Sequence, residues 1–201
     1  MSISSPENEG DMMDALTRLR KSLSKAPVMW KGDYPYFIHP ITDGVPKLDP
    51  EVLSAVVELS SELVDWENID LILGIEAMGL PLCAPLSIES SKPLLVARKR
   101  SYGLPGEITI DQTTGYSKGE MFLNDISEGE RVLILDDVLS TGGTLRSVID
   151  GVRRSGGIVS QIITVIEKGP GLANLQKEMP EIEFNSLVRL EMDGSKIIIL
   201  D

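Results

Sequence analysis

Apolar residues occur along this chain in short uninterrupted runs that alternate with longer stretches of helical spacing. Uninterrupted runs are typical of strands buried on both faces of a parallel sheet. They occupy residues 70–73, 93–97, 132–135, 158–166 and 196–200. Helical spacing predicts helices that begin near Met12, at Pro50, near Leu80, at Leu145 and after Lys168. The alternation predicts an α/β fold with a doubly wound, mainly parallel sheet.

Two stretches do not follow this alternation. Residues 1–10 are polar and rich in helix breakers, so we expect a disordered tail ahead of a single domain at 11–201. Residues 30–50 carry several prolines and the aromatic group Tyr34, Tyr36 and Phe37, and they predict a long irregular loop that either serves function or covers the core. His39 is the only histidine in the sequence and has no partner at metal-ligand spacing, so we predict a structural role for it.

Composition limits the classes of protein that fit this pattern. The chain has 201 residues, a formal net charge of -12 and one cysteine, Cys83. The negative charge argues against nucleic acid or an anionic membrane as partner, because both require a broad basic surface. No apolar run reaches the roughly 18 residues of a membrane span, and no signal peptide is present. We therefore expect a cytoplasmic protein with Cys83 in its core.

The segment from Arg131 to Val152 joins a buried strand, an acidic pair, a glycine-rich loop and an amphipathic helix. The acidic pair is Asp136 and Asp137, and the loop is Ser140, Thr141, Gly142, Gly143 and Thr144. Glycines bring backbone N–H groups close to a ligand, and the start of a helix attracts anions, so the loop suits a phosphate. Carboxylates at the end of a strand suit vicinal ribose hydroxyls or a hydrated Mg2+.

A plain strand-to-helix turn is the alternative interpretation of this segment, with Ser140 or Thr144 as the helix N-cap. The segment is not a Walker A loop, because no lysine follows the glycines, and it lacks the G-x-G-x-x-G pattern of dinucleotide sites. The acidic pair beside the loop favours ligand binding over the plain turn.

Three further stretches surround the same predicted edge of the sheet. Arg98, Lys99 and Arg100 follow the strand at 93–97, and ligands of open α/β sheets bind at the carboxyl ends of strands. The turn at residues 74–79 resembles a second backbone cradle, although a plain turn is the simpler interpretation. Residues 102–115 form a Gly- and Pro-bearing excursion that residues 116–123 complete as a ribbon, which suggests a lid.

The motif VLILDDVLSTGGT at 132–144 closely resembles the phosphoribosyl-pyrophosphate (PRPP) binding motif of type I phosphoribosyltransferases. The strings EAMG, RKRSYGLPGE and GYSKGE resemble purine phosphoribosyltransferases of the adenine type. Near the N-terminus, KGDYPYFIHPITDGVP and DPEVL resemble the archaeal hypoxanthine/guanine phosphoribosyltransferases. The resemblance covers roughly residues 12–201.

The resemblance implies a purine salvage enzyme that converts a purine base and PRPP into a nucleoside monophosphate and pyrophosphate with Mg2+. It implies that Asp136 and Asp137 contact the ribose hydroxyls and the metal, and that residues 140–144 hold the 5'-phosphate. It implies a pyrophosphate site at Ala77, Met78, Gly79, Arg98 and Lys99. It places a hood over the base at residues 36–43, with Phe37 and Ile38 as purine-binding residues, and it suggests a homodimer.

Two departures from the family leave the proton-handling residue open. Ser140 stands where enzymes of the human hypoxanthine/guanine type carry an Asp, and Gly115 stands where adenine enzymes carry a Glu. Candidates by proximity in sequence are Glu107, Asp111 and Glu120. Hypoxanthine or guanine is the expected base, an adenine-specific enzyme is the first alternative, and a PRPP-sensing regulator without turnover is an alternative of another class.

Overall fold

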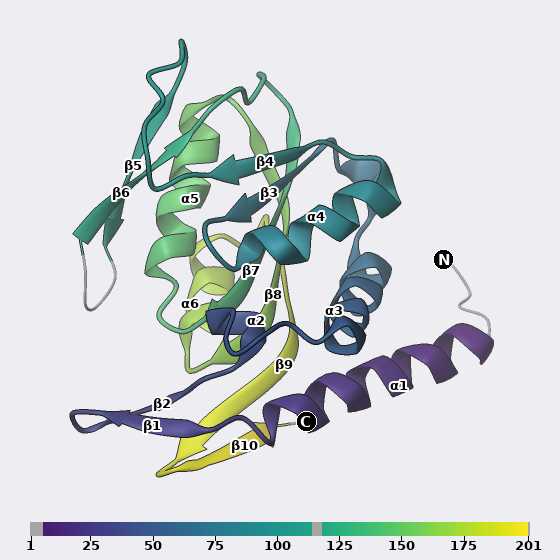
Figure 1. Cartoon of the computed structure of the whole chain (residues 1–201). Coiled ribbons are helices and arrows are strands. Elements are labelled where there is room, and N and C mark those ends of the chain that lie inside the picture. The colour runs from purple at the N-terminus through teal and green to yellow at the C-terminus, as the bar shows by residue number, and fades with distance from the viewer. Residues whose placement is uncertain (1–5, 114–117, 201) are drawn as a thin grey trace.

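The computed structural model describes residues 6–113 and 118–200 (Figure 1). Six strands form its central sheet, in the order β10-β9-β8-β7-β3-β4. They are β3 (Leu71–Ile75), β4 (Leu94–Ala97), β7 (Arg131–Leu139), β8 (Ile158–Lys168), β9 (Glu183–Asp193) and β10 (Lys196–Leu200). The pairs from β4 to β9 are parallel, and β10 joins β9 in antiparallel register. This arrangement confirms the predicted doubly wound, mainly parallel sheet.

Helices cover both faces of the sheet (Figure 1). The helices on one side are α1 (Pro6–Leu23), α3 (Pro50–Leu63) and α4 (Gly79–Ser90), and those on the other side are α5 (Gly143–Arg154) and α6 (Gly171–Glu178). A short 3-10 helix, η1 (Trp66–Asn68), precedes β3. Leu133 and Leu135 of β7 pack with the first group, and Val132 and Ile134 pack with the second. Because successive side chains of a strand point to opposite faces, an uninterrupted apolar run supplies both cores.

The ends of several elements differ from the predicted ones. Helix α1 begins at Pro6, so residues 6–10 are helical where the sequence predicts a tail, and residues 1–5 lie outside the described residues. Proline is tolerated in the first turn of a helix, so Pro6 does not prevent this start. Strand β9 is missing from the predicted elements because polar residues interrupt its apolar ones, so it has no long apolar run. Cys83 is fully buried, as expected.

The segment predicted as an irregular loop folds into a hairpin and a short helix. Strands β1 (Val28–Lys31) and β2 (Tyr34–Phe37) pair in antiparallel register, and α2 (Pro40–Asp43) follows them. In Figure 1 the hairpin lies beside the β9–β10 hairpin, and α2 lies near the carboxyl end of β7. We call residues 34–43 the hood, because this segment stands over that end of the sheet.

His39 is a structural residue of the hood, as predicted. Its side chain is buried, and its Nδ1 accepts a hydrogen bond from the backbone N–H of Ile41, which caps α2. Nδ1 therefore carries no proton, and Nε2 donates to the hydroxyl of Ser22, 2.9 Å away. Burial lowers the pKa of His39 from 6.5 to about 4.

We expect His39 to make the protein less stable as the pH falls from 6.5 to 4. The unfolded chain takes up the imidazole proton near pH 6.5 and the folded chain only near pH 4, so the free energy of unfolding drops across this window. The contribution is on the order of 2 to 3 kcal/mol. Denaturant titrations of wild type and His39→Asn at several pH values measure it. Asn retains an oxygen that can accept the hydrogen bond from Ile41 N–H, and it does not titrate. If the free energy of unfolding changed equally with pH in the two proteins, the prediction would be contradicted.

A two-stranded ribbon projects from the sheet beside α5 (Figure 1). It consists of β5 (Ile108–Thr113) and β6 (Lys118–Leu123), which pair in antiparallel register. The predicted ribbon is therefore present, and its first strand lies within the predicted excursion at 102–115. Ile110, Met121 and Leu123 anchor it in the core. The tip, with Gly115 and Tyr116, lies outside the described residues. Within the described residues, no helix has the length and apolar character to cross a membrane.

Candidate active site

The acidic pair lies inside β7 and not after it. The sequence predicts a strand that ends at Leu135, but β7 continues to Leu139 because β8 continues to pair with it, with Asp136 opposite Thr164 and Val138 opposite Ile166. The added ladder bonds outweigh the low strand propensity of two adjacent acids. The extended strand holds both carboxylates on a rigid element at the site edge.

Burial makes ionisation of this pair costly. Asp136 is 8% exposed, and burial, followed by the charge of Asp137, raises its pKa well above the usual value of 3.8. Burial also raises the pKa of Asp137, to about 6. A buried carboxylate beside a half-buried one needs a cation or hydroxyl donors if both are to be stable as anions. The pair is therefore suited to bind such groups.

The glycine-rich loop leads directly into α5. Gly142 occupies the N-cap with φ +82°, so the cap is not a Ser140 or Thr144 side chain as in the plain-turn alternative. The loop places the N-terminus of a twelve-residue amphipathic helix at the site, which favours a phosphate. Gly171 of α6 supports the loop from behind, because its N–H donates to the carbonyl oxygen of Ser140 at 3.0 Å.

The second predicted cradle packs against β7, the strand that carries the acidic pair. Ala77 and Met78 lead into α4, which begins at Gly79, and the peptide bond between Glu76 and Ala77 is cis. A Cβ on Gly79 would lie 3.0 Å from the carbonyl oxygen of Leu135 in β7. Glycine at this position therefore lets the loop approach the acidic strand closely.

Arg98 and Lys99 follow β4, the edge strand that pairs with β3. Glu76 lies 3.4 Å from Arg98 Nε and accepts a 2.9 Å hydrogen bond from the N–H of Lys99. The charge of Lys99 lowers the pKa of Asp136, against the larger effect of burial. The structure thus brings the predicted basic pair, the second cradle and the acidic pair together.

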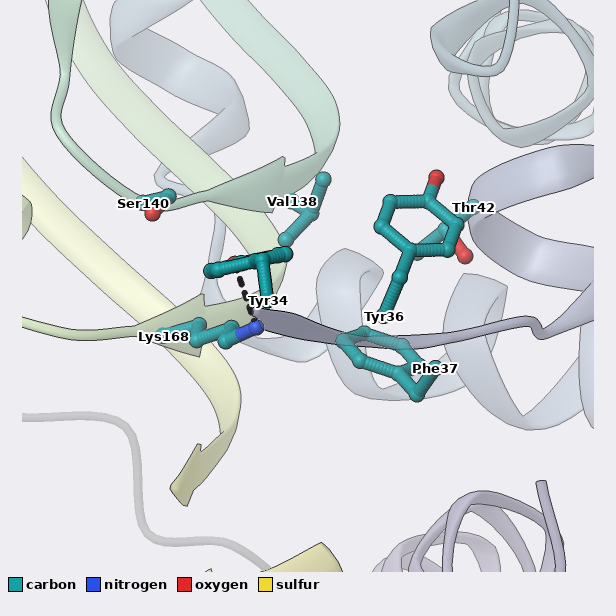
Figure 2. A pocket seen from close by; sticks show the side chains of 7 residues that line it. All are labelled: Tyr34, Tyr36, Phe37, Thr42, Val138, Ser140 and Lys168. Atoms are coloured by element: carbon teal, nitrogen blue, oxygen red, sulfur yellow. Dashed lines mark hydrogen bonds between the residues drawn. The ribbon is translucent and has the colours of Figure 1, made fainter. Parts of the chain in front are cut away.

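A cavity of about 120 Å³ lies between the hood and the end of β7, where Val138 follows the acidic pair (Figure 2). It is lined by Tyr34, Tyr36, Phe37, Thr42, Val138, Ser140 and Lys168. The hood supplies one wall and the ends of β7 and β8 supply the other. Of the two residues predicted to bind a purine, Phe37 lines this cavity, and Ile38 is not among the described residues that do.

Sequence reasoning missed Lys168 and Val138 as members of this wall, whereas Thr42 falls within the predicted hood and Tyr34 within the aromatic stretch before it. Lys168 Nζ donates to the hydroxyl of Tyr34 at 2.6 Å and lies 4.4 Å from the centre of its ring (Figure 2). The available signal was the position of Lys168 at the carboxyl end of a buried strand, the same signal that identified Arg98 and Lys99. Its ammonium group brings a cation to a mostly apolar cavity.

Hydrogen bonds to Asp43 fix the shape of the hood. Asp43 accepts from the hydroxyl of Tyr36 at 2.7 Å, from the N–H of His39 at 3.0 Å and from the hydroxyl of Thr42 at 2.6 Å. Burial, followed by the hydrogen bond that the Tyr36 hydroxyl donates to Asp43, raises the pKa of Tyr36 above its usual range. Tyr36 therefore stays a neutral phenol on the cavity wall.

The three acids considered for proton handling lie on or beside the ribbon and not on the cavity wall. Glu107 accepts hydrogen bonds from Ser101 and from the N–H of Tyr102, which lower its pKa. Asp111 and Glu120 face each other across the ribbon. In the described part of the chain, none of the three lines the cavity.

Comparison with known proteins identifies the family of the chain. The family model described as "Phosphoribosyl transferase domain" matches residues 48–195. A hypoxanthine/guanine phosphoribosyltransferase of Ferroglobus placidus is 48% identical over 185 residues, which cover 91% of this chain and 97% of the relative. One of Aciduliprofundum boonei is 44% identical over 183 residues, 91% of this chain and 98% of the relative.

Solved structures share the fold. Adenine phosphoribosyltransferase from Rhodothermus marinus superposes with a TM-score of 0.69 at 26% identity, covering 89% of this chain and 99% of that one. Adenine phosphoribosyltransferase from Thermoanaerobacter pseudethanolicus has a TM-score of 0.71 at 24% identity. The match covers 87% of this chain and 99% of that one. The elements that surround the acidic pair therefore belong to a shared architecture.

Proposed function

This chain belongs to the phosphoribosyltransferase family, and we propose that it transfers the 5-phosphoribosyl group of PRPP to hypoxanthine or guanine in purine salvage. The products are IMP or GMP and pyrophosphate. The observation that carries the proposal is a cavity lined by Val138, which directly follows the acidic pair in β7, and by Ser140 of the phosphate loop. The relatives named for this activity support the choice of base.

Each part of PRPP has a complementary group in the site. The 5'-phosphate suits the loop from Ser140 to Thr144 at the start of α5, and the ribose hydroxyls suit Asp136 and Asp137. The pyrophosphate suits the backbone from Ala77 to Gly79 together with the cations of Arg98 and Lys99. The purine suits the cavity between the hood and Val138.

The charges of the site have the signs that the reaction requires. Displacement at the anomeric carbon builds positive charge on the sugar and negative charge on the departing pyrophosphate. The carboxylates of Asp136 and Asp137 stabilise the first, and Arg98 and Lys99 stabilise the second. Because these groups are held on strand ends, little reorganisation accompanies the reaction.

Asp136 and Asp137 also fit a Mg2+ ion. Their buried oxygens are ligands that this ion prefers, and a divalent cation would offset the cost of ionising both. The described residues contain no group of three or more His, Cys, Asp or Glu side chains able to hold a metal. The ion would therefore take its remaining ligands from water and from PRPP, where it neutralises phosphate charge.

Product formation from PRPP and Mg2+ with hypoxanthine, guanine, adenine and xanthine tests the proposed function. We expect conversion of hypoxanthine or guanine. Conversion of adenine alone would assign the chain to the adenine group, whose solved members share the fold. PRPP binding with no product from any base, together with affinity for nucleic acid, would favour the regulator instead.

Lys168 supplies a specific test of base choice. An ammonium group donates to the carbonyl oxygen of a 6-oxopurine and finds no acceptor in the amino group of adenine. We expect Lys168→Met to lower kcat/KM for hypoxanthine by about tenfold or more, since a hydrogen bond to a charged group contributes about 1.5 to 3 kcal/mol. Activity with adenine should change little.

Steady-state rates with both bases measure this effect. Lys177→Met on the exposed side of α6 is the matched control and should behave as wild type. Equal losses for hypoxanthine and adenine in Lys168→Met would contradict a role for Lys168 in base choice.

A cytoplasmic location and a homodimer complete the proposal, on the strength of the family resemblance. Light scattering coupled to gel filtration measures the assembly. A monomer at micromolar concentration would refute the homodimer and leave the proposed reaction untouched.

A further inference from the structure

Glu76 places a negative charge in the loop that is proposed to receive pyrophosphate. Like charges repel each other, and more strongly where protein partly excludes water. A carboxylate next to a polyanion site therefore weakens binding unless it performs another task. The contacts of Glu76 identify that task.

The Glu76 side chain joins the loop after β3 to the end of β4. One carboxylate oxygen, Oε2, accepts a 2.9 Å hydrogen bond from the N–H of Lys99 and lies 3.4 Å from Arg98 Nε. The backbone adds a third link, since the N–H of Glu76 donates to the carbonyl of Ala97 at 3.1 Å. The side chain is 25% exposed, so water screens these contacts only in part. Glu76 thus contacts both residues that supply the cationic half of the site.

The backbone of Arg98 is held from the other side by the ribbon. Its N–H donates to the carbonyl of Phe122 at 3.0 Å, and its carbonyl accepts from the N–H of Phe122 at 2.7 Å. Its guanidinium donates to the hydroxyl of Tyr102 at 3.3 Å. Fixing a long arginine side chain costs about 1.5 to 2 kcal/mol of rotamer entropy. Glu76 and Tyr102 already hold the Arg98 side chain in place in the free protein, so the ligand does not have to order it on binding.

We propose that Glu76 is a positioning residue for pyrophosphate, acting through Arg98 and Lys99. Its carboxylate orients the Arg98 guanidinium and fixes the Lys99 backbone next to the Ala77–Gly79 loop. The two cations offset its charge, so the assembled group presents a net positive surface to the ligand. This inference rests on the proposed function, because that function assigns pyrophosphate to this half of the site.

Two substitutions separate the contacts. Glu76→Gln keeps an oxygen that accepts from Lys99 N–H and removes the charge facing Arg98, whereas Glu76→Ala removes both. We expect the dissociation constant of pyrophosphate with Mg2+, measured by titration calorimetry, to rise about tenfold in Glu76→Ala and less in Glu76→Gln. The KM for PRPP should rise in parallel, and the KM for the purine should stay within about twofold.

Glu89→Gln, near the end of helix α4, is the matched control and should bind pyrophosphate as wild type does. Wild-type affinity for pyrophosphate in Glu76→Ala, or equal losses for PRPP and purine, would overturn the proposal. If Glu76→Ala does not fold, Glu76→Gln tests the proposal by itself. The proposal then requires Glu76→Gln to bind pyrophosphate more weakly than wild type does. Calorimetry needs no turnover, so a wild type that binds pyrophosphate and forms no nucleotide refutes the proposed function and still tests Glu76.

Discussion

Replacing Asp136 and Asp137 by Asn is expected to lower turnover by about 10²- to 10⁴-fold and at the same time to stabilise the fold. The loss of turnover follows from the sugar cation, which loses two facing negative charges where it develops in the transition state. Asn keeps the size and shape of Asp, so packing within β7 should persist. Initial rates with saturating PRPP and hypoxanthine measure the effect.

The gain in stability follows from the raised pKa values. Between pH 3.8 and about 6 the folded protein holds a proton on Asp137 that the unfolded chain has lost. The free energy of unfolding therefore falls as the pH rises through this window, and at pH 7 the ionised Asp137 costs about 1 to 3 kcal/mol. Asn removes this cost.

Thermal unfolding without ligand measures the difference between the two proteins from pH 4 to 8. We expect Tm of the double variant to exceed that of wild type at pH 7 and the gap to close toward pH 4. The contribution of His39 is present in both proteins and cancels. Asp193→Asn, on the exposed β9–β10 hairpin, is the control for loss of charge alone. Unchanged turnover in the double variant would refute the assignment of the pair.

The sheet and its anion loops were predictable because their signals are local in the sequence. Apolar runs mark the buried strands, and the glycines with hydroxyl residues from Ser140 to Thr144 mark a backbone cradle within a few residues. Charge at the end of a run, as at Arg98, marks the edge where ligands bind. Each of these signals depends on neighbours along the chain.

Features that depend on distant neighbours were not predictable in this way. Strand β7 reaches Leu139 because β8 pairs with it, and the acids alone predict an earlier end. Lys168 joins the cavity through Tyr34, which is 134 positions earlier in the chain. Phe37 is the last residue of β2 and lines the cavity, whereas Ile38 lies after the end of that strand and does not.

Gly171→Ala is expected to lower kcat/KM for PRPP by about 100-fold, although this glycine lies outside the recognised motif. A Cβ at this position would lie 2.9 Å from the carbonyl carbon of Ser140 and 3.0 Å from that of Thr141. Both atoms are backbone, so the contact can be relieved only by moving the phosphate loop or α6. A displacement near 1 Å at a catalytic site costs on the order of 10²-fold in rate.

The same crowding should destabilise the fold by about 1 to 3 kcal/mol, as overpacking generally does. Gly129→Ala separates the two effects. Gly129 has φ +76° with nothing within 4 Å of a built Cβ, so alanine there costs about 1 to 2 kcal/mol of backbone strain without touching the loop. We expect Gly129→Ala to lower Tm and keep kcat/KM for PRPP within twofold of wild type. If Gly171→Ala behaves the same way, the loop tolerates displacement, and the packing of α6 against Ser140 has no role in phosphate binding.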